Sequence, residues 1–481
     1  MQQTGPDAFY AAAHEAAADT ELNRKLENAS SRHFEHLAVA KKEFAPYETE
    51  RDIARRIKEE SIERLDQLLS ELRDKLVARG VKVFFADDAA MARDYILKIA
   101  RAAGVTRVVK GKSMTTEEIA LNPALEQAGI EAVETDLGEY IVQLRNEPPS
   151  HIITPAIHLS KEDIGQLFAD KLGTAYTSDP PALTAVARER LRDKFLSAGM
   201  GITGVNFAVA ETGTLVVVEN EGNGRFCTTT PEIHIAVMGI EKVIPKLEDL
   251  SHFLEILART ATGQRLTAYT SFLNGPRGAE DQDGPREVHL VILDNGRTRM
   301  LADPILREAL YCLRCGACLN ACPVYRHIGG HAYKSAYPGP IGSIVSPSLF
   351  GTAASGHLAF ASTLCGACKD VCPVKIDIPR ILLHLRWKMT EGGGDKVAWP
   401  QAPARVRAAA GWFARAARYP AVVRVAGRIG ALLLKPFGQD GYLRRMPGPF
   451  GAWTRVRDFP VPPANGANGR SSERAPGLDV K

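Results

Sequence analysis

Apolar residues recur at helical spacing in the first part of the chain. Over residues 51–78 they fall on one face of a helix, at Ile53, Ile57, Ile62, Leu65, Leu68, Leu69 and Leu72. This period predicts amphipathic helices that bury one face. Residues 1–75, which include an Ala-rich run over 11–20, are therefore expected to be helical and to pack on the domain that comes after them.

Strand-like runs then alternate with helical ones up to residue 293. Strands are predicted at residues 81–85, 107–110, 132–134 and 151–154, with helices at 89–104 and 115–128. Such alternation predicts an α/β domain with a parallel sheet, here residues 76–297. A less regular group of strands is predicted at residues 206–211, 213–220, 234–238, 268–272 and 288–293, with a hairpin turn or bulge at 211–214 and a loop at 275–285.

Helices and long loops are predicted after this domain. A cysteine-rich module is predicted at residues 298–390. It starts with a helix over 299–311 that leads into the first cysteine loop, and it ends in a helix over 378–389. A glycine linker at 392–394 opens a basic helical domain at 391–460. The Pro-, Asn-, Gly- and Ser-rich end, residues 461–481, is expected to be disordered.

Seven of the eight cysteines lie between residues 312 and 372, in two runs that each end in Cys-Pro. The first run, Cys312, Cys315, Cys318 and Cys322, has the bacterial ferredoxin spacing, in which the fourth cysteine ligates the other cluster. This pattern predicts an enlarged, helix-rich ferredoxin module with two [4Fe-4S] clusters. The predicted ligands are Cys312, Cys315, Cys318 and Cys372 for cluster 1, and Cys322, Cys365 and Cys368 for cluster 2.

The second run lacks one thiolate, because Ser362 stands where a fourth cysteine belongs. Serine is a poorer ligand for iron, so cluster 2 is expected to have water, a partner residue or a substrate at one iron, or to lose that iron and become [3Fe-4S]. Zinc is the alternative metal, but seven cysteines in two ferredoxin spacings fit tetrahedral zinc sites badly.

Composition indicates a soluble protein of several domains. The chain has 481 residues, 45% of them hydrophobic, and its start shows neither a secretory signal nor a twin arginine. Thiols clustered for metal binding suit a reducing compartment, which predicts a cytoplasmic location. Residues 391–481 hold fifteen Lys and Arg against six Asp and Glu. This basic end favours docking on an acidic surface over nucleic-acid binding, and peripheral membrane contact is a further hypothesis.

Other motifs are weaker. The G-x-G-x-x-G of residues 199–204 follows a predicted helix and precedes a strand, so a turn is expected instead of a dinucleotide site. Residues 110–115 resemble part of a P-loop that could receive an anion. A polar group, Glu211, Glu219, Glu221 and Arg225, could bind substrate or simply form charged turns. Cys227 is expected to be a buried small hydrophobe and His234 a core histidine.

Three stretches together resemble the lactate utilization protein B family: residues 211–225, residues 234–245 and the two cysteine runs. The resemblance implies an α/β lactate-utilization (LUD) domain of isomerase/CoA-transferase-like fold, an α-helical dicluster ferredoxin module and a helical C-terminal domain. It also implies a part in the oxidation of L-lactate to pyruvate, with a cysteine-rich subunit and a second LUD-domain subunit as partners. The family's cluster ligands correspond to the two sets given above.

Lactate oxidation removes two electrons, whereas an iron-sulfur cubane passes one at a time. The chain alone is therefore not expected to be a sufficient dehydrogenase, and its predicted role is an electron-transfer subunit of an oxidoreductase complex. The main alternative is a ligand-binding scaffold subunit whose clusters are structural. A third hypothesis, in which an open iron acts as a Lewis acid on a hydroxy acid, rests on Ser362 alone.

Overall fold

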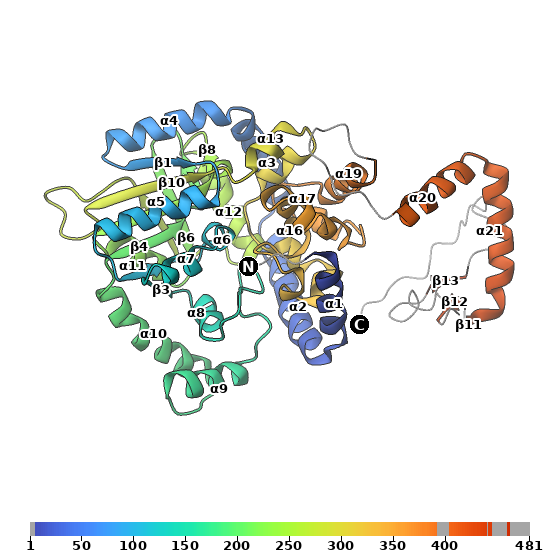
Figure 1. Ribbon diagram of the computed structural model, residues 1–481, viewed down its shortest axis with the longest axis horizontal. Helices are drawn as coiled ribbons and strands as arrows, with labels where there is room; N and C mark the ends of the chain where they lie inside the picture. Colours follow the sequence, from blue (N-terminus) through green and yellow to red (C-terminus); the bar gives the residue numbers. More distant parts are fainter. Residues whose placement is uncertain (1–4, 392–403, 440, 445–458, 462–481) are drawn as a thin grey trace. The chain divides into compact units, whose positions relative to one another are not determined.

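We describe the protein from a computed structural model, which describes residues 5–391, 404–439, 441–444 and 459–461 (Figure 1). The predicted linker at 392–394 and most of the predicted disordered end lie outside these residues. The chain forms two compact units, residues 1–400 and 401–481. Within the described residues, no helix is both long enough and apolar enough to cross a bilayer.

A six-stranded sheet forms the centre of the first unit, and every neighbouring pair of strands in it is parallel. Its strands lie in the order β1, β10, β7, β4, β2, β3. Their bounds are β1 (Lys82–Ala86), β10 (Glu287–Leu293), β7 (Ile233–Gly239), β4 (Met200–Gly204), β2 (Arg107–Lys110) and β3 (Glu131–Glu134). The predicted α/β class with a parallel sheet is confirmed.

Helices cover both faces of this sheet, as parallel sheets require. On one face, α5 (Ala89–Ala102) and α7 (Leu121–Gln127) pack against alternate side chains of β7, including Ile235 and Val237. On the other face lie α4 (Leu65–Ala78), next to Ala236 and Met238, and α10 (Pro180–Leu196). Successive side chains of β7 point to opposite faces of the sheet, and helices bury both faces. The strand is therefore hydrophobic at almost every position.

Side-chain caps fix where several helices begin. The Asp88 carboxylate accepts the Met91 N–H at the start of α5. The Asp136 carboxylate does the same for Glu139 at the start of α8 (Leu137–Leu144). Ser160 and Asp163 form a reciprocal capping box for α9 (Lys161–Leu172). Each cap satisfies backbone donors that the first helical turn leaves unpaired.

A second, four-stranded sheet lies beside the first, in the order β8 (Val243–Ile244), β5 (Phe207–Val209), β6 (Thr214–Glu219) and β9 (Tyr269–Leu273). The β5–β6 pair is antiparallel, and Gly213 has a positive φ of 63° in the turn between them. The predicted hairpin turn is thus confirmed. Helix α12 (Asp249–Thr262) packs on this sheet, with Phe253 stacked on Phe207.

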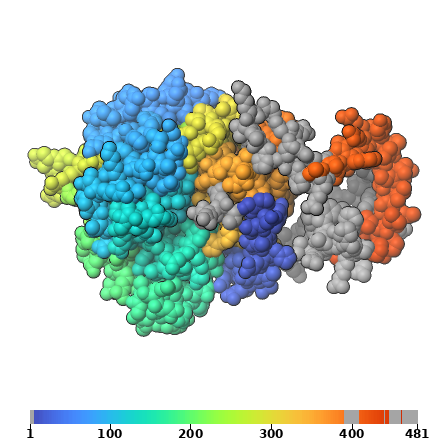
Figure 2. All heavy atoms as spheres, in the orientation of Figure 1, coloured from blue at the N-terminus to red at the C-terminus, as the bar shows by residue number. Residues whose placement is uncertain are grey.

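The amino-terminal helices α1 (Pro6–Ala18), α2 (Thr20–Lys42) and α3 (Tyr47–Glu63) pack against the cysteine-rich module (Figures 1 and 2). That module contains 3₁₀ segments η2 (Leu306–Tyr311), η3 (His331–Tyr333) and η4 (Gly356–Phe360), and helices α13 (Arg297–Ala302), α14 (Ala317–Asn320), α15 (Pro323–Ile328), α16 (Gly339–Leu349), α17 (Thr352–Ser355), α18 (Ala367–Asp370) and α19 (Ile378–Glu391). The expected helix-rich character of the module is confirmed.

Arg51 joins helix α3 to the second cysteine run. Its buried guanidinium donates to the carbonyl of Cys372 from Nε (3.0 Å) and Nη2 (2.7 Å), and to that of Asp370 (2.9 Å). One turn further on, Arg55 pairs with Glu308 at 2.9 Å. Helix α3 thus holds the backbone of the loop that carries Cys372.

A second buried network joins the α/β domain to the first cysteine run. Both terminal nitrogens of Arg297 donate to the Glu118 carboxylate at 2.8 Å, and its Nε donates to Glu241 at 2.6 Å. The Tyr337 hydroxyl donates to Glu118 at 2.7 Å, and Arg314 lies 3.7 Å from Glu241. Arg297 is 1% exposed, so these ion pairs are shielded from water.

Four sequence predictions need correction. Residues 151–154 form a turn instead of a strand, because His151 Nδ1 accepts the N–H groups of Ile153 and Thr154 that a strand would offer its neighbour. Residues 200–204 of the G-x-G-x-x-G stretch form the largely buried strand β4 instead of a turn. Its glycines allow close packing: a Cβ on Gly201 would lie 1.9 Å from the Cys227 carbonyl oxygen.

The other two corrections concern helices that break. The helix predicted at 115–128 divides into α6 (Met114–Glu118) and α7 around Ala120, which has a positive φ of 50°. The helix predicted at 299–311 divides into α13 and η2 around Asp303-Pro304, since proline lacks the N–H that a continuous helix needs.

The second unit contains α20 (Ala404–Ala417), α21 (Pro420–Leu434), η5 (Lys435–Phe437) and three short antiparallel strands, β11 (Gly438–Gln439), β12 (Tyr442–Leu443) and β13 (Phe459–Pro460). Both helices expose apolar side chains, among them Trp412 and Leu432. The expectation of a helical segment is met over these residues.

Replacing Arg51 by Met is expected to lower stability by about 3 kcal/mol, because the buried carbonyl of Cys372 and the partly buried carbonyl of Asp370 lose their charged donor. The measurement is the thermal unfolding midpoint of the protein with its clusters, recorded under anaerobic conditions. The matched control is Arg56→Met on the same helix, where the side chain is more accessible to water. Equal midpoints for the two variants would contradict the role of Arg51.

Candidate iron-sulfur centre

The first cysteine run forms a tight loop before α14. Arg314, between Cys312 and Cys315, has a positive φ of 64°, and Gly316 follows with a φ of 76°. The Arg314 N–H points at Cys312 Sγ at 3.3 Å. A non-glycine residue in the left-handed region is strained, so this conformation indicates a functional constraint on the loop.

The second run repeats this geometry with serine in the place of one cysteine. Leu364 has a positive φ of 58° and Gly366 one of 91°, ahead of α18. The Leu364 N–H donates to Ser362 Oγ at 3.1 Å. Ser362 Oγ therefore occupies the position in its loop that Cys312 Sγ occupies in the first one.

Long-range electrostatics show which thiols lie near each other. Burial raises the pKa of Cys315, and the nearby Cys312 and Cys372 raise it further. Burial also raises the pKa of Cys368 to about 12, with further increases from Cys322 and Cys365. Cys318 lies near Cys368 as well as near Cys312, Cys315 and Cys372. The division of the seven cysteines into two ligand sets stays a prediction from their spacing.

The cysteines and the groups around them suit iron-sulfur clusters, because they can stabilise the negative charge of cluster sulfur. Buried thiols with a raised pKa stay protonated at neutral pH by themselves, and metal binding is what makes thiolates favourable there. The Ile376 N–H donates to Cys372 Sγ at 3.3 Å, and the Arg51 charge lies close by. Backbone donors and a buried cation both stabilise sulfur that carries negative charge.

Exposure differs between the two sets. Cys315 and Cys372 are buried, whereas Cys365 is exposed. Cys322 and Cys368 are buried, so the second set reaches the protein surface at Cys365 alone. A redox group of another molecule can come close there.

A cavity of about 350 Å³ lies between the first cysteine loop and the carboxyl ends of the central strands. Loop residues after β2 and β4 line one side, and Leu313, Arg314 and Tyr337 line the other. Strand order reverses between β2 and β4, since the chain continues outward to β3 on one side and to β7 on the other. Ligands of open α/β sheets bind at such a reversal.

The polar residues singled out from sequence divide into two groups. Glu219 and Glu221 line this cavity, as do Lys112 and Ser113 of the P-loop-like stretch. Burial, followed by Asp136, raises the pKa of Glu221 to about 7. Glu211 instead accepts the Leu247 N–H, and Arg225 offers its backbone N–H to Glu219. Lys110 is buried against Glu134.

Cys227 and His234 lie in the interior, as predicted. Cys227 is fully buried in α11 (Asn223–Thr229), and burial raises its pKa to about 12. His234 Nε2 lies 2.9 Å from Thr203 Oγ1, and burial lowers the pKa of the ring to about 4. Both side chains belong to the packing of the sheet.

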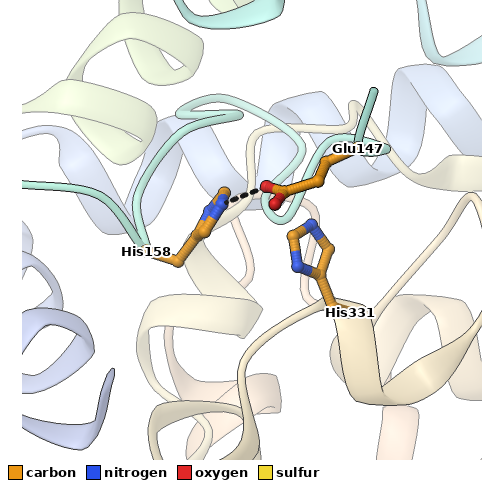
Figure 3. A group of neighbouring side chains, drawn as sticks. All are labelled: Glu147, His158 and His331. Atoms are coloured by element: carbon orange, nitrogen blue, oxygen red, sulfur yellow. Dashed lines mark hydrogen bonds and ion pairs between the residues drawn. The ribbon is translucent and has the colours of Figure 1, made fainter. Parts of the chain in front are cut away.

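Glu147, His158 and His331 form a further group, with one potential ligand atom each within 4.8 Å of one another (Figure 3). Their partners are already fixed: His158 Nε2 bonds Glu147 at 2.9 Å, Arg145 pairs with Glu147 at 2.8 Å, and His331 Nε2 bonds the Pro148 carbonyl at 2.8 Å. The Arg145 charge opposes a cation here. We interpret the group as a polar link between the LUD domain and the cysteine-rich module.

Sequence reasoning missed three cations near Cys312 of the first cysteine run: Lys58, Lys242 and Arg314. Burial, followed by Lys242, lowers the pKa of Lys58 to about 7, while Cys312 acts in the opposite direction. Arg314 carried a signal in the sequence, since it lies between two predicted ligands. Lys58 and Lys242 carried none, because only the fold brings them to the cysteine loop.

Comparisons with known proteins identify both domains. A family model described as the LUD domain matches residues 69–293, and one described as a 4Fe-4S dicluster domain matches residues 308–376. A crystal structure of a DUF162 family protein from Deinococcus radiodurans aligns with 48% of this chain and 98% of its own, at 16% identity and a TM-score of 0.27. That score is too low to bear on the fold.

Three curated relatives align over most of their length, and each is named lactate utilization protein B. The protein from Oceanobacillus iheyensis is 44% identical, with 90% of each chain covered. The Bacillus pumilus protein is 42% identical over 95% of each chain, and the Shouchella clausii protein 45% identical over 88%. With an LUD domain followed by a 4Fe-4S dicluster domain that binds iron-sulfur clusters, this chain belongs to the lactate utilization protein B family.

Proposed function

We propose that the chain is an iron-sulfur electron-transfer subunit in the oxidation of L-lactate to pyruvate. The observation that carries this proposal is that all seven clustered cysteines lie inside the 4Fe-4S dicluster domain of a lactate utilization protein B family member. When bound, the clusters supply single-electron transfer. The proposed location is the cytoplasm, whose reducing conditions keep such thiols available for iron.

The proposed clusters are two [4Fe-4S] centres. Cys312, Cys315, Cys318 and Cys372 hold cluster 1, and Cys322, Cys365 and Cys368 hold cluster 2. Around cluster 1, the Arg51 guanidinium and the backbone N–H groups of Arg314 and Ile376 stabilise negative charge on sulfur. Ser362 Oγ lies beside the Leu364 N–H, in the loop position where the first run has Cys312 Sγ, and no cysteine supplies the fourth ligand of cluster 2.

The proposed partners are a cysteine-rich subunit and a second LUD-domain subunit. The exposed Cys365 supports contact with another redox protein, because electron transfer needs a short distance between the cluster and the redox group of the partner. The substrate chemistry, which removes two electrons and two protons, then takes place in the assembled complex. The direct test is anaerobic EPR of the chain with these subunits, before and after L-lactate. Clusters that dithionite reduces and lactate never does would refute the role.

Replacing Cys315 by Ala is expected to remove the EPR signal and visible absorbance of cluster 1 and to stop growth on L-lactate. The matched control is Cys227→Ala, which removes the one cysteine outside the two sets. That variant should keep both centres. Normal lactate growth of the Cys315 variant would contradict an electron-transfer role.

Replacing Ser362 by Cys is expected to convert cluster 2 into an all-thiolate cubane, because the new Sγ takes the position of the Oγ beside the Leu364 N–H. Mössbauer spectra should show one distinct iron, or a [3Fe-4S] centre, in the wild type and two ordinary cubanes in the variant. Thr363→Cys, one residue out of register, is the control and should change neither centre. Two ordinary all-thiolate cubanes in the wild type would overturn the prediction.

A further inference from the structure

The cavity beside the first cysteine loop has the size and position of a binding site. Its volume of about 350 Å³ falls in the range of small-molecule sites, roughly 300–1,000 Å³. It lies where the strand order reverses, at the carboxyl ends of β2 and β4. It is closed on the other side by the loop that carries Cys312 and Cys315, so an occupant would lie beside cluster 1.

The acidic groups of the cavity are already bonded within the protein. Asp136 caps α8 and lies 3.2 Å from Lys112 Nζ. Glu219 accepts the N–H groups of Gly224 and Arg225 at 2.8 and 2.7 Å. Glu221 accepts the Leu137 N–H at 2.9 Å. These carboxylates therefore hold the cavity wall together and offer little attraction to a cation.

The basic groups are different, since two of them have donors without an acceptor, although Arg314 also pairs with Glu241 at 3.7 Å. Lys242 lines the cavity at 9% exposure, and its ammonium group has neither a hydrogen bond nor an ion pair within the part of the chain that the structure describes. Arg314 stacks over the Tyr337 ring, 4.4 Å from its centroid, and its Nη1 is buried without a partner among the described residues. Buried charged donors of this kind are costly unless something satisfies them.

The remainder of the wall is mixed, with hydroxyl and amide side chains such as Thr203, Asn206 and Asn223 on part of it. Side chains from β6 and α12 and the residue after β4 supply an apolar part: Val205, Val217, Leu257, Ala258 and Ala261. An occupant that suits the cavity has an anionic group at the Lys242 end and a small apolar body. Inorganic anions lack such a body.

We propose that this cavity binds a small organic carboxylate, with Lys242 and Arg314 as its anion-binding groups. The planar fork of arginine suits the two oxygens of a carboxylate, and lysine adds a point charge. The assignment of the carboxylate to the class of 2-hydroxy and 2-oxo acids rests on the proposed function, whereas the binding of an anion with an apolar body rests on the cavity alone.

The test is anaerobic titration calorimetry of the full chain with its clusters assembled and no partner present. The probes are L-lactate, pyruvate, 2-hydroxyhexanoate and inorganic phosphate. We expect the carboxylates to bind at one site, and Lys242→Met to weaken them by about 10- to 100-fold through the loss of one charged hydrogen bond. Lys246→Met, an exposed lysine outside the cavity lining, is the control and should bind normally.

A second variant keeps the test valid if Lys242→Met does not fold. Ala261→Leu fills the apolar wall and should weaken 2-hydroxyhexanoate more than L-lactate. Absence of carboxylate binding to the wild type, binding of phosphate alone, or equal affinities in all variants would each overturn the inference. Because no electron transfer is measured, carboxylate binding by a chain whose clusters lactate never reduces would support the cavity site while the proposed function fails.

Discussion

The buried ion pairs of Arg297 hold the parallel sheet and the first cysteine run of the first unit together. A guanidinium removed from water is costly unless its donors are satisfied, and here Glu118 at the end of α6 and Glu241 in the 3₁₀ segment after β7 satisfy them. Glu241 in turn faces Arg314 of the cysteine loop. The carboxyl edge of the parallel sheet and the first cysteine run are thereby fixed to the same buried charges, and neither can shift without leaving an ion unpaired.

This coupling explains why a lactate-utilization domain and a ferredoxin module share one compact body. The cavity walls come from loops after β2 and β4, from η1 (Ile240–Lys242) and from the cysteine loop. Helix α3 reaches the same region from the other side, through Lys58 to the Glu241 carbonyl and through Arg51 to the second cysteine run. The two modules are therefore best regarded as one structural unit around the cluster ligands.

The features that could be predicted from the sequence are those encoded locally. Cysteine spacing is fixed by the geometry of a tight loop, and hydrophobic periodicity is fixed by burial, so the iron-sulfur module and the parallel sheet could be inferred from residue patterns alone. The role of Lys242 could not, because it depends on which strands become neighbours. The turn at residues 151–154 was misread since a buried histidine ring, and not a pattern of side chains, satisfies its backbone donors.

The repeated loop geometry of the two cysteine runs has a consequence for assembly. In the proposed ligand sets each run lends its last cysteine to the other, so the iron-sulfur cores interlock segments about fifty residues apart in the chain. Closing so long a loop is entropically costly until both ends are ligated. Cluster insertion is then cooperative. Insertion of the first cluster orders the backbone that binds the second, and neither cysteine run can bind a cluster without the other run.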